Sequence, residues 1–202
     1  MILDLIQISK KYNLKINGVI HIGAHHGEEH NLYKQLNINN IVYFEPVKKT
    51  FDVLKNKITD AVLYNMALGN DNKNIEMFVE DEDVYGCSSI LQPSSNYNGI
   101  AFSNKEIVEM RTLDSFNFET FNFLNIDVQG YEMEVLKGAE KTLYSVDCII
   151  CEINRNTKQK SMDYIGAQPV ENIIEYLQNY GFKLVEENWA GVSWGDGFFV
   201  KT

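Results

Sequence analysis

Three carboxylates stand at the ends of apolar runs that have the composition of β-strands: Glu45, Asp127 and Glu152. Because open α/β sheets keep their ligands beyond the carboxyl ends of their strands, we expect these side chains in one cleft. A carboxylate there can accept hydrogen bonds from ribose hydroxyls or take a proton from an acceptor alcohol. We predict a ribose-binding role for Glu45 and catalytic roles for Asp127 and Glu152.

Structural and metal-binding roles compete with these assignments. Asp127 and Glu45 are each placed to cap the helix that follows, and Glu152 can be an ordinary acid at a strand end. Together with Asn154, Asp127 and Glu152 also offer the oxygen ligands that Mg²⁺ or Mn²⁺ prefers. Such an ion would lower the pKa of a bound diol. We keep an ion held by Asp127 and Glu152 as an alternative.

A glycine-rich turn precedes these acids in the chain. The apolar run 19–22 stops at Gly23, and after Gly27 the chain continues as a polar segment suited to a helix. This pattern predicts a strand, a tight turn and a helix, because glycine lets the backbone turn sharply and lets a ligand approach the helix N-terminus. We expect Gly23, Ala24 and Gly27 to contact a nucleotide-type cofactor.

All four histidines lie between His21 and His30. His26 and His30 have the i, i+4 spacing of zinc-binding helices, but the sequence shows no evident acid or cysteine that completes the set. We therefore place His25 beside the cofactor or the acceptor. There it is an alternative to Asp127 as the general base, because an imidazole titrates near neutral pH.

Strands and helices alternate along most of the chain. This alternation predicts a Rossmann-like α/β fold, a mostly parallel sheet with right-handed crossovers. The last two strands form a hairpin, joined by a loop that carries Trp189 and Trp194, and imply one antiparallel strand. The expected strands are 18–22, 41–45, 61–65, 121–126, 146–153, 182–185 and 197–200, and the expected helices are 2–12 (within an N-terminal segment 1–14), 28–37, 46–58, 131–143 and 169–180.

Residues 66–112 break the pattern of alternating strands and helices. The alternation of apolar and polar residues at 74–79 and 106–110 predicts an antiparallel insertion. The intervening loop is rich in Ser, Asn, Gly and Tyr, and a loop of this length inside a compact domain is usually a lid or a binding loop. We expect Ser88 and Ser89, which lie in it, to meet the substrate.

The composition limits the partners of this protein. Its 202 residues carry a formal net charge of -10, which argues against a nucleic-acid partner because phosphate binding needs several basic residues on one face. No stretch approaches the roughly 20 apolar residues that span a bilayer, and the first residues lack the features of a signal peptide. We expect a single cytoplasmic domain without membrane association.

Three cysteines do not make a disulfide framework. Cys148 and Cys151 lie in one expected strand, where positions three apart point to opposite faces, so these thiols can neither join each other nor share a metal. Core packing in a reducing cytoplasm suits them and Cys87.

Six short blocks stand in a fixed order along the chain: HIGAHHG at 21–27, VYFEP at 42–46, NMALG at 65–69, TLD at 112–114, IDVQGYE at 126–132 and VLKGA at 135–139. In this order they resemble the FkbM-type branch of the S-adenosylmethionine-dependent methyltransferases. The resemblance implies a class I methyltransferase fold with a seven-stranded sheet and an antiparallel C-terminal hairpin. It also implies S-adenosylmethionine bound over the strand ends and methyl transfer to a hydroxyl.

The resemblance assigns further residues to the cofactor. Asn65 would read the edge of the adenine, while Met66 and Ala67 would pack on its face. Pro46 follows the expected ribose-binding acid. His21 stands where the family often has an acidic residue that orients the methionine end of the cofactor, and we expect its imidazole to hydrogen-bond there.

The acceptor is less well defined by the sequence. Tyr131, Trp189 and Trp194 can stack on a sugar or another flat acceptor, although each can equally be ordinary packing. With Asn154 they form the expected acceptor site. We favour an O-methyltransferase acting on a small hydroxylated molecule, a sugar or glycan being the preferred class.

Two other functions share parts of this pattern. An NAD-dependent oxidoreductase would use the same glycine turn and Glu45. A cofactor-binding module without catalysis is the third possibility, and the presence of Asp127 together with Gly23 and Glu45 speaks against it. The sequence indicates no oligomeric state.

Overall fold

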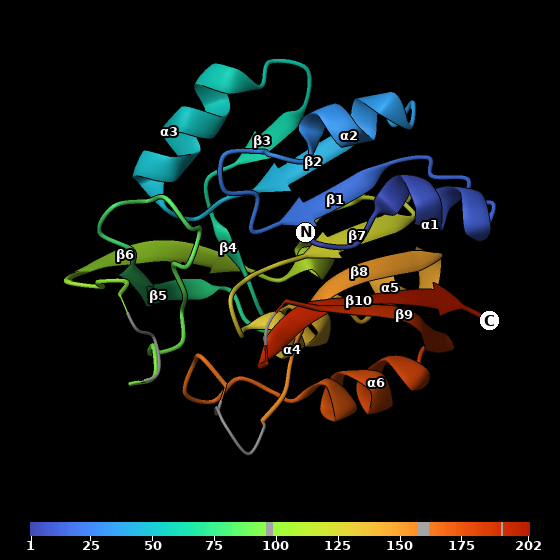
Figure 1. The fold of residues 1–202 in the computed structure, drawn as a ribbon. Coiled ribbons are helices and arrows are strands. Elements are labelled where there is room, and N and C mark those ends of the chain that lie inside the picture. Colours follow the sequence, from blue (N-terminus) through green and yellow to red (C-terminus); the bar gives the residue numbers. More distant parts are fainter. Residues whose placement is uncertain (96–98, 157–161, 191) are drawn as a thin grey trace.

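A seven-stranded sheet forms the centre of the molecule (Figure 1). The computed structural model describes residues 1–95, 99–156, 162–190 and 192–202. The strand order is β3-β2-β1-β7-β8-β10-β9, in which β10 runs antiparallel to both of its neighbours and the other described pairs are parallel. This confirms the expected α/β sheet with an antiparallel C-terminal hairpin. The strands are β1 (Val19–Ile22), β2 (Ile41–Phe44), β3 (Val62–Tyr64), β7 (Phe123–Ile126), β8 (Cys148–Asn154), β9 (Phe182–Ala190) and β10 (Trp194–Lys201).

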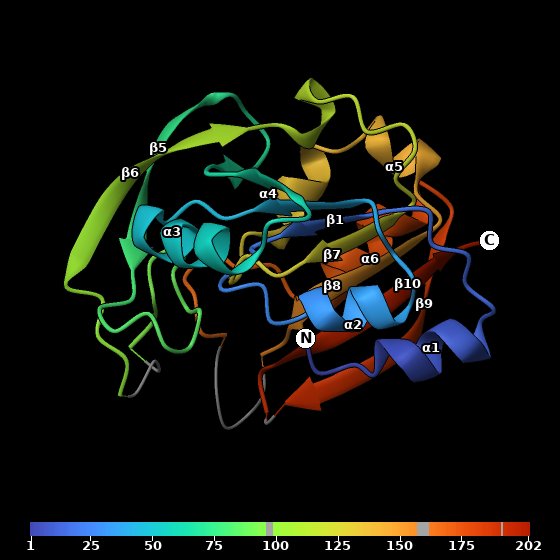
Figure 2. The ribbon, with the colours of Figure 1, turned by 90° about the horizontal axis from the view of Figure 1, so that it is seen from above.

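Helices cover both faces of this sheet (Figures 1 and 2). They are α1 (Leu5–Lys11), α2 (His30–Gln35) and α3 (Lys48–Lys57) on one face, and α4 (Glu132–Lys137), α5 (Thr142–Ser145) and α6 (Val170–Gln178) on the other. Because successive strand residues point to opposite faces, Val19 and Tyr43 pack toward α1–α3, whereas Ile20 and Phe44 pack toward α4–α6. Within the described ranges, no helix combines the length and apolar composition that crossing a bilayer requires.

The cysteines occupy the positions expected from strand geometry. Cys148 and Cys151 both lie in β8, but Cys148 packs in the core on the α1–α3 side and Cys151 in the core on the α4–α6 side. Both thiols are buried, as is that of Cys87, and none of the three forms a disulfide bond within the part of the chain that the structure describes. Burial raises the pKa of Cys148 to about 12, which keeps this thiol protonated and unreactive.

A smaller sheet confirms the antiparallel insertion. Strands β4 (Ala67–Leu68), β5 (Lys73–Val79) and β6 (Asn104–Arg111) have the order β4-β6-β5, and β5 pairs with β6 in antiparallel register. The short 3₁₀ helix η1 (Leu113–Ser115) then returns the chain to the main sheet. The small sheet has its own core, which includes Met77 and Met110.

The first part of the loop between β5 and β6 is folded onto the strand that it leaves. Ser89 pairs with Phe78 through two backbone hydrogen bonds of 2.8 and 2.9 Å. The Glu80 carboxylate is 3% exposed and accepts the backbone N–H groups of Val84, Tyr85 and Cys87 at about 3.0 Å. One buried acid therefore organises the turn that faces the carboxyl ends of the central strands.

Two expectations about local structure were wrong. The helix expected at 131–143 is broken into α4 and α5, because Gly138 lies so close to the small sheet that a Cβ there would be 1.9 Å from the carbonyl oxygen of Gly69. The Asp114 carboxylate then starts α5 anew by accepting the N–H of Thr142 at 2.9 Å. Trp189 and Trp194 lie in β9 and β10 rather than in a loop, since both strands extend further than their apolar runs.

Gly23 offers a test of how tightly the strand ends approach each other. Its φ is +84°, and a Cβ would lie 1.7 Å from the carbonyl oxygen of Asp127. Gly181 has a matching φ of +83°, but the nearest atom to its Cβ position is 3.8 Å away. We expect Gly181→Ala to cost about 1–2 kcal/mol, the penalty of the left-handed backbone, and Gly23→Ala to cost at least about 2 kcal/mol more.

Urea unfolding followed by circular dichroism measures both variants. Equal losses of stability at the two positions would show that Gly23 is needed only for its backbone conformation and not for the close approach.

Candidate active site

A cleft opens beyond the carboxyl ends of β1, β2 and β7, where the main sheet meets the 80–90 loop. Ile22 and Gly23 contribute from the first of these strands, Phe44 and Glu45 from the second, and Asp127 follows the third. This is where open α/β sheets bind their ligands. The structure therefore brings Glu45 and Asp127 into one cleft, as the sequence led us to expect.

One wall of the cleft is apolar. Phe44, Leu68 and Ile90 line it together with Met66 and Ala67. The last two are the residues expected to pack on the face of an adenine, and their surroundings suit a flat, weakly polar ring.

Asn65 and Pro46 have different positions relative to the cleft. Pro46 lines the cleft, whereas the Asn65 side chain donates from Nδ2 to the carbonyl oxygens of Glu45 and Pro46, both at 2.9 Å. Asn65 thus fixes the chain as it leaves β2 and is not part of the cleft lining. A contact between Asn65 and the edge of an adenine stays a prediction.

The Glu45 carboxylate joins the glycine turn to the end of β2. Its Oε2 accepts the N–H of His25 and its Oε1 accepts the N–H of Val47, each at 2.9 Å. Burial raises the pKa of Glu45 to about 7, and the two backbone hydrogen bonds offset this effect only in part. A carboxylate oxygen has two lone pairs, so these contacts leave capacity for ligand hydroxyls.

The glycine turn is fixed by its own backbone. The N–H groups of Gly23 and Ala24 both donate to the carbonyl oxygen of Phe44 at 3.0 Å. Gly27 does not line the cleft; a Cβ there would lie 2.4 Å from Cδ1 of Ile58, just beyond α3, so this glycine serves helix packing. Gly23 is therefore the turn glycine that directly borders the ligand space.

His25 projects from this turn with a φ of +45°. Burial lowers the pKa of His25, but the hydrogen bond to Glu28 and the negative charges of Glu28 and Asp83 outweigh burial and raise it overall. His25 lines the cleft, as expected.

A second pocket, polar in character, adjoins the cleft. Its acidic side chains are Glu28, Glu29 and Asp127, and it shares Gly23 and His25 with the cleft. The α-amino group of Met1 lies here, 3.1 Å from Glu29. Neither lining includes a lysine or arginine among the described residues. The electrostatic environment of the joined pockets therefore favours a cationic ligand.

His21 lies at the floor of the polar pocket inside a buried network. Its ring nitrogens contact the Tyr33 hydroxyl at 3.1 Å and the Asn125 amide at 3.3 Å, and this amide also donates to Tyr33 at 2.7 Å. Burial lowers the pKa of His21, so its imidazole is neutral at pH 7. Contact between His21 and a cofactor stays a prediction.

Asp127 and Glu152 are joined by Gln129, a residue that the sequence interpretation missed. Its Nε2 donates to Asp127 Oδ1 at 2.6 Å and to Glu152 Oε2 at 2.7 Å. Burial, with the charges of Asp127 and Glu132, raises the pKa of Glu152 well above its usual range. Glu152 is 5% exposed and does not line the cleft, whereas Asp127 lines both pockets.

The turn between Asp127 and α4 is held by another acid. The Glu132 carboxylate accepts the N–H groups of Val128 at 3.1 Å and Gly130 at 3.0 Å, and no side chain among the described residues caps the N-terminus of α4, so the capping role considered for Asp127 is wrong. Burial raises the pKa of Glu132 to about 7. Asp127 is thereby left available to a ligand on the cleft side.

The residues expected to meet the acceptor are divided by the structure. Ser88 lines the cleft. Ser89 is fully buried and donates from Oγ to the carbonyl oxygen of Gln129 at 2.7 Å, so it anchors the loop. Tyr131 packs against the small core and does not line the cleft.

The other three residues of the expected acceptor site lie at the carboxyl end of β8 and in the hairpin of β9 and β10. Asn154 is 2% exposed and donates to Glu152 at 3.3 Å. The ring of Trp189 is covered by the Arg155 guanidinium at 3.8 Å. Trp194 is 38% exposed and pairs with Asn154, which places it at the same carboxyl edge of the sheet as the cleft.

Sequence interpretation also missed Asp83 and Thr50, which both line the cleft. Asp83 lies in the 80–90 loop, and nothing in its sequence neighbourhood marks it. For Gln129 a signal existed, because it is part of the block 126–132 and lies in the turn after β7.

Comparisons with known proteins agree with this geometry. Residues 21–184 match the family model of the methyltransferase FkbM domain. No curated protein matches the chain. Among solved structures, the methyltransferase FkbM from Methylobacillus flagellatus KT is 12% identical with a TM-score of 0.62; the alignment covers 91% of this chain and 43% of that one. The chain thus spans less than half the length of that structure.

A second solved structure has the same fold at low identity. It is the magnesium protoporphyrin IX methyltransferase from Synechocystis PCC 6803 with bound S-adenosylhomocysteine, 9% identical with a TM-score of 0.59 over 98% of this chain and 80% of that chain. The same enzyme with bound S-adenosylmethionine gives a TM-score of 0.56, covering 98% and 76% of the two chains. With the family model matching most of its length, the chain belongs to the FkbM methyltransferase family.

Proposed function

We propose that this protein transfers a methyl group from S-adenosylmethionine to a hydroxyl of a small acceptor, a sugar or glycan. The observation that carries the proposal is the lining of the joined pockets, which is apolar on one side and acidic on the other. Glu45, Asp127 and Glu28 contribute carboxylates, and no lysine or arginine takes part among the described residues. A sulfonium nucleoside, cationic at the sulfur and the amino group, is complementary to this lining.

The same lining disfavours the oxidoreductase alternative. A nicotinamide dinucleotide carries a pyrophosphate, and its two negative charges would meet the acids of the polar pocket, among them Glu28 and Asp127. Like charges in a partly enclosed cleft repel strongly because the local dielectric constant is low.

The chain has residues for each part of the cofactor. Met66 and Ala67 would pack on the adenine, and Glu45 would accept hydrogen bonds from the ribose hydroxyls. Gly23 lines both pockets and would present its backbone to the cofactor. The acids of the polar pocket, among them Glu29, would attract the cationic methionine end.

When bound, S-adenosylmethionine supplies an electrophilic methyl group with a good leaving group. The protein's main contribution is then alignment, worth roughly 7–11 kcal/mol, against about 3–5 kcal/mol from a general base. Asp127 is placed to remove the acceptor's proton, because it lines both pockets and is held by Gln129. His25 is the alternative base.

Glu152 has a different role in this proposal. Because burial and neighbouring carboxylates raise its pKa well above the usual range, it holds a proton near neutral pH and supports Gln129 rather than taking a proton itself. An Mg²⁺ or Mn²⁺ ion on Asp127 and Glu152 stays a prediction, and such an ion would have to displace the Gln129 amide that donates to both.

Several features support a carbohydrate acceptor. The net charge of -10 disfavours nucleic acid, and Trp194 offers an exposed ring at the carboxyl edge of the sheet, on which a sugar can stack. Three cysteines without a disulfide bond among the described residues suit a reducing compartment such as the cytoplasm.

Calorimetry with S-adenosylhomocysteine and NADH tests the cofactor. We expect binding of S-adenosylhomocysteine and none of NADH, because the acidic lining accepts the first and repels the second. Incubation with labelled S-adenosylmethionine and a panel of glycans then identifies the acceptor. Binding of NADH without any response to S-adenosylhomocysteine would contradict the proposal.

Two isosteric substitutions separate cofactor binding from turnover. Asp127→Asn should lower kcat by about 10²- to 10⁴-fold, as loss of a general base does, while the affinity for S-adenosylhomocysteine changes little. Glu45→Gln should weaken that affinity about tenfold or more with a smaller effect on kcat, because an amide nitrogen replaces one of the two oxygens that accept hydrogen bonds. Steady-state kinetics and calorimetry give both quantities, and equal losses of both in each variant would defeat the assignments.

The acceptor role of Trp194 has its own test. Trp194→Ala should raise KM for the acceptor about five- to a hundredfold, the loss of one stacking contact of about 1–3 kcal/mol. The matched control is Tyr144→Ala, which removes an aromatic side chain that is 72% exposed on α5. Similar KM values for the two variants would place the acceptor elsewhere.

A further inference from the structure

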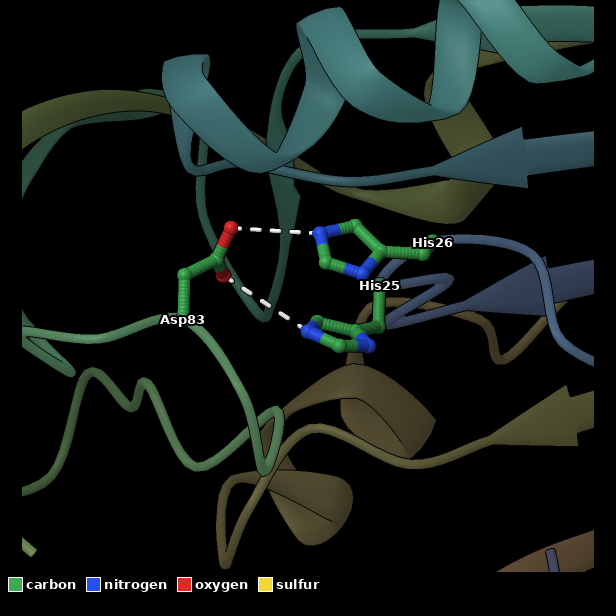
Figure 3. Close-up of side chains that lie close together, drawn as sticks. All are labelled: His25, His26 and Asp83. Carbon is green, nitrogen blue, oxygen red and sulfur yellow. Dashed lines mark hydrogen bonds and ion pairs between the residues drawn. The ribbon is translucent and has the colours of Figure 1, made fainter.

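A cluster of three metal-ligating side chains lies at the wall of the cleft: His25, His26 and Asp83 (Figure 3). The two histidines come from the glycine turn, and Asp83 comes from the 80–90 loop. Their donor atoms all lie within 4.8 Å of one another. Figure 3 shows both imidazole rings turned with Nε2 toward the Asp83 carboxylate.

The two histidines contact different oxygens of Asp83, at distances similar to those between ligands of a bound ion. His26 Nε2 is 3.2 Å from Asp83 Oδ2, and His25 Nε2 is 3.6 Å from Asp83 Oδ1. Ligand atoms about 2.0–2.2 Å from a tetrahedral zinc ion lie about 3.3–3.6 Å apart. The three side chains therefore need only small adjustments to share one ion.

One atom of the cluster points to a ligand independently. His25 Nε2 is buried and makes no hydrogen bond to any part of the chain that the structure describes. A buried ring nitrogen without a hydrogen bond is costly, and coordination of an ion would satisfy it. The two rings stack with centroids 3.9 Å apart and planes tilted by 29°, and both Nε2 atoms face Asp83.

Outer hydrogen bonds orient the ligands as they do in metal sites. Glu28 Oε1 lies 2.9 Å from His25 Nδ1, the arrangement in which a carboxylate fixes the tautomer of a metal-bound histidine. The Thr50 hydroxyl donates to Asp83 Oδ1 at 2.7 Å and holds this side chain in place.

We propose that His25, His26 and Asp83 form a binding site for a divalent transition metal of the zinc class. Two imidazoles and one carboxylate suit Zn²⁺ and its neighbours, whereas Mg²⁺ and Ca²⁺ prefer an all-oxygen set. The site is distinct from the carboxylates of Asp127 and Glu152. It does not depend on the proposed methyl transfer.

A bound ion would tie the 80–90 loop to the glycine turn. His25 and Asp83 both line the cleft, so the ion would form part of its wall. Three protein ligands leave a tetrahedral ion one further position, which water or a hydroxyl from the cleft can fill. The ion would thus fix the loop that carries Ser88 over the ligand space.

Titration of the metal-free protein with Co²⁺ and Zn²⁺ tests the site. We expect one equivalent of Co²⁺ with visible d–d absorption, displaced by Zn²⁺, and a rise in Tm on addition of Zn²⁺. His26→Ala and Asp83→Asn should each weaken Zn²⁺ binding at least about tenfold and abolish the Co²⁺ spectrum. Glu28→Gln should weaken binding about tenfold, because it removes the orienting carboxylate.

His30→Ala is the matched control, since His30 pairs with Asp60 and lies outside the cluster. It should keep the metal affinity and the spectrum of the wild type. Unchanged binding in both His26→Ala and Asp83→Asn would overturn the site, and so would loss of the Co²⁺ spectrum in Asp127→Asn alone. Thermal unfolding without metal checks the fold, and His26→Ala remains informative if Asp83→Asn fails to fold.

Affinity for S-adenosylhomocysteine is measured on the same metal-free samples. Metal binding without cofactor binding would support the metal site and count against the methyltransferase proposal. Cofactor binding without metal binding would support the methyltransferase proposal and count against the metal site.

Discussion

The close approach of two strand-end turns is the constraint on which the rest of the site depends. The turn after β1 and the turn after β7 touch at Gly23, where the absence of a Cβ lets the Asp127 backbone lie against the glycine. The N–H of Asp127 then donates to the carbonyl of Ile22 at 2.9 Å. Because of this contact, Asp127 after β7 and the glycine turn after β1 border the same cleft.

Buried carboxylates hold the segments around this contact. Glu45 accepts backbone N–H groups from the glycine turn and the start of α3, Glu132 from the turn after β7, and Glu80 from the 80–90 loop. Each of these carboxylates loses its hydration on burial. Hydrogen bonds from backbone N–H groups compensate for this loss, in place of an ion pair with a basic side chain. Among the described residues, these three carboxylates therefore order the loops around the cleft without a lysine or arginine as their own partner, and the cleft keeps its acidic character.

Much of the fold followed from local pattern. Apolar runs such as 19–22 and 41–44 became parallel strands because they are buried on both faces of the sheet. The insertion was visible in the alternation at 74–79. The break between α4 and α5 was not visible, because it depends on the backbone of Gly69 packing against Gly138 from a distant segment.

For the site, the sequence by itself determined which acids and glycines lie at the strand ends. Chain order alone decides which residues follow the carboxyl end of a strand. Only the tertiary structure decided how these residues are used. Gln129 joins Asp127 to Glu152, Ser89 is buried instead of facing a substrate, and Asp83 lies beside two histidines that are distant from it in the chain. Such side-chain pairings depend on how a long loop folds back onto the sheet. No local pattern of apolar and polar residues predicts how that loop folds.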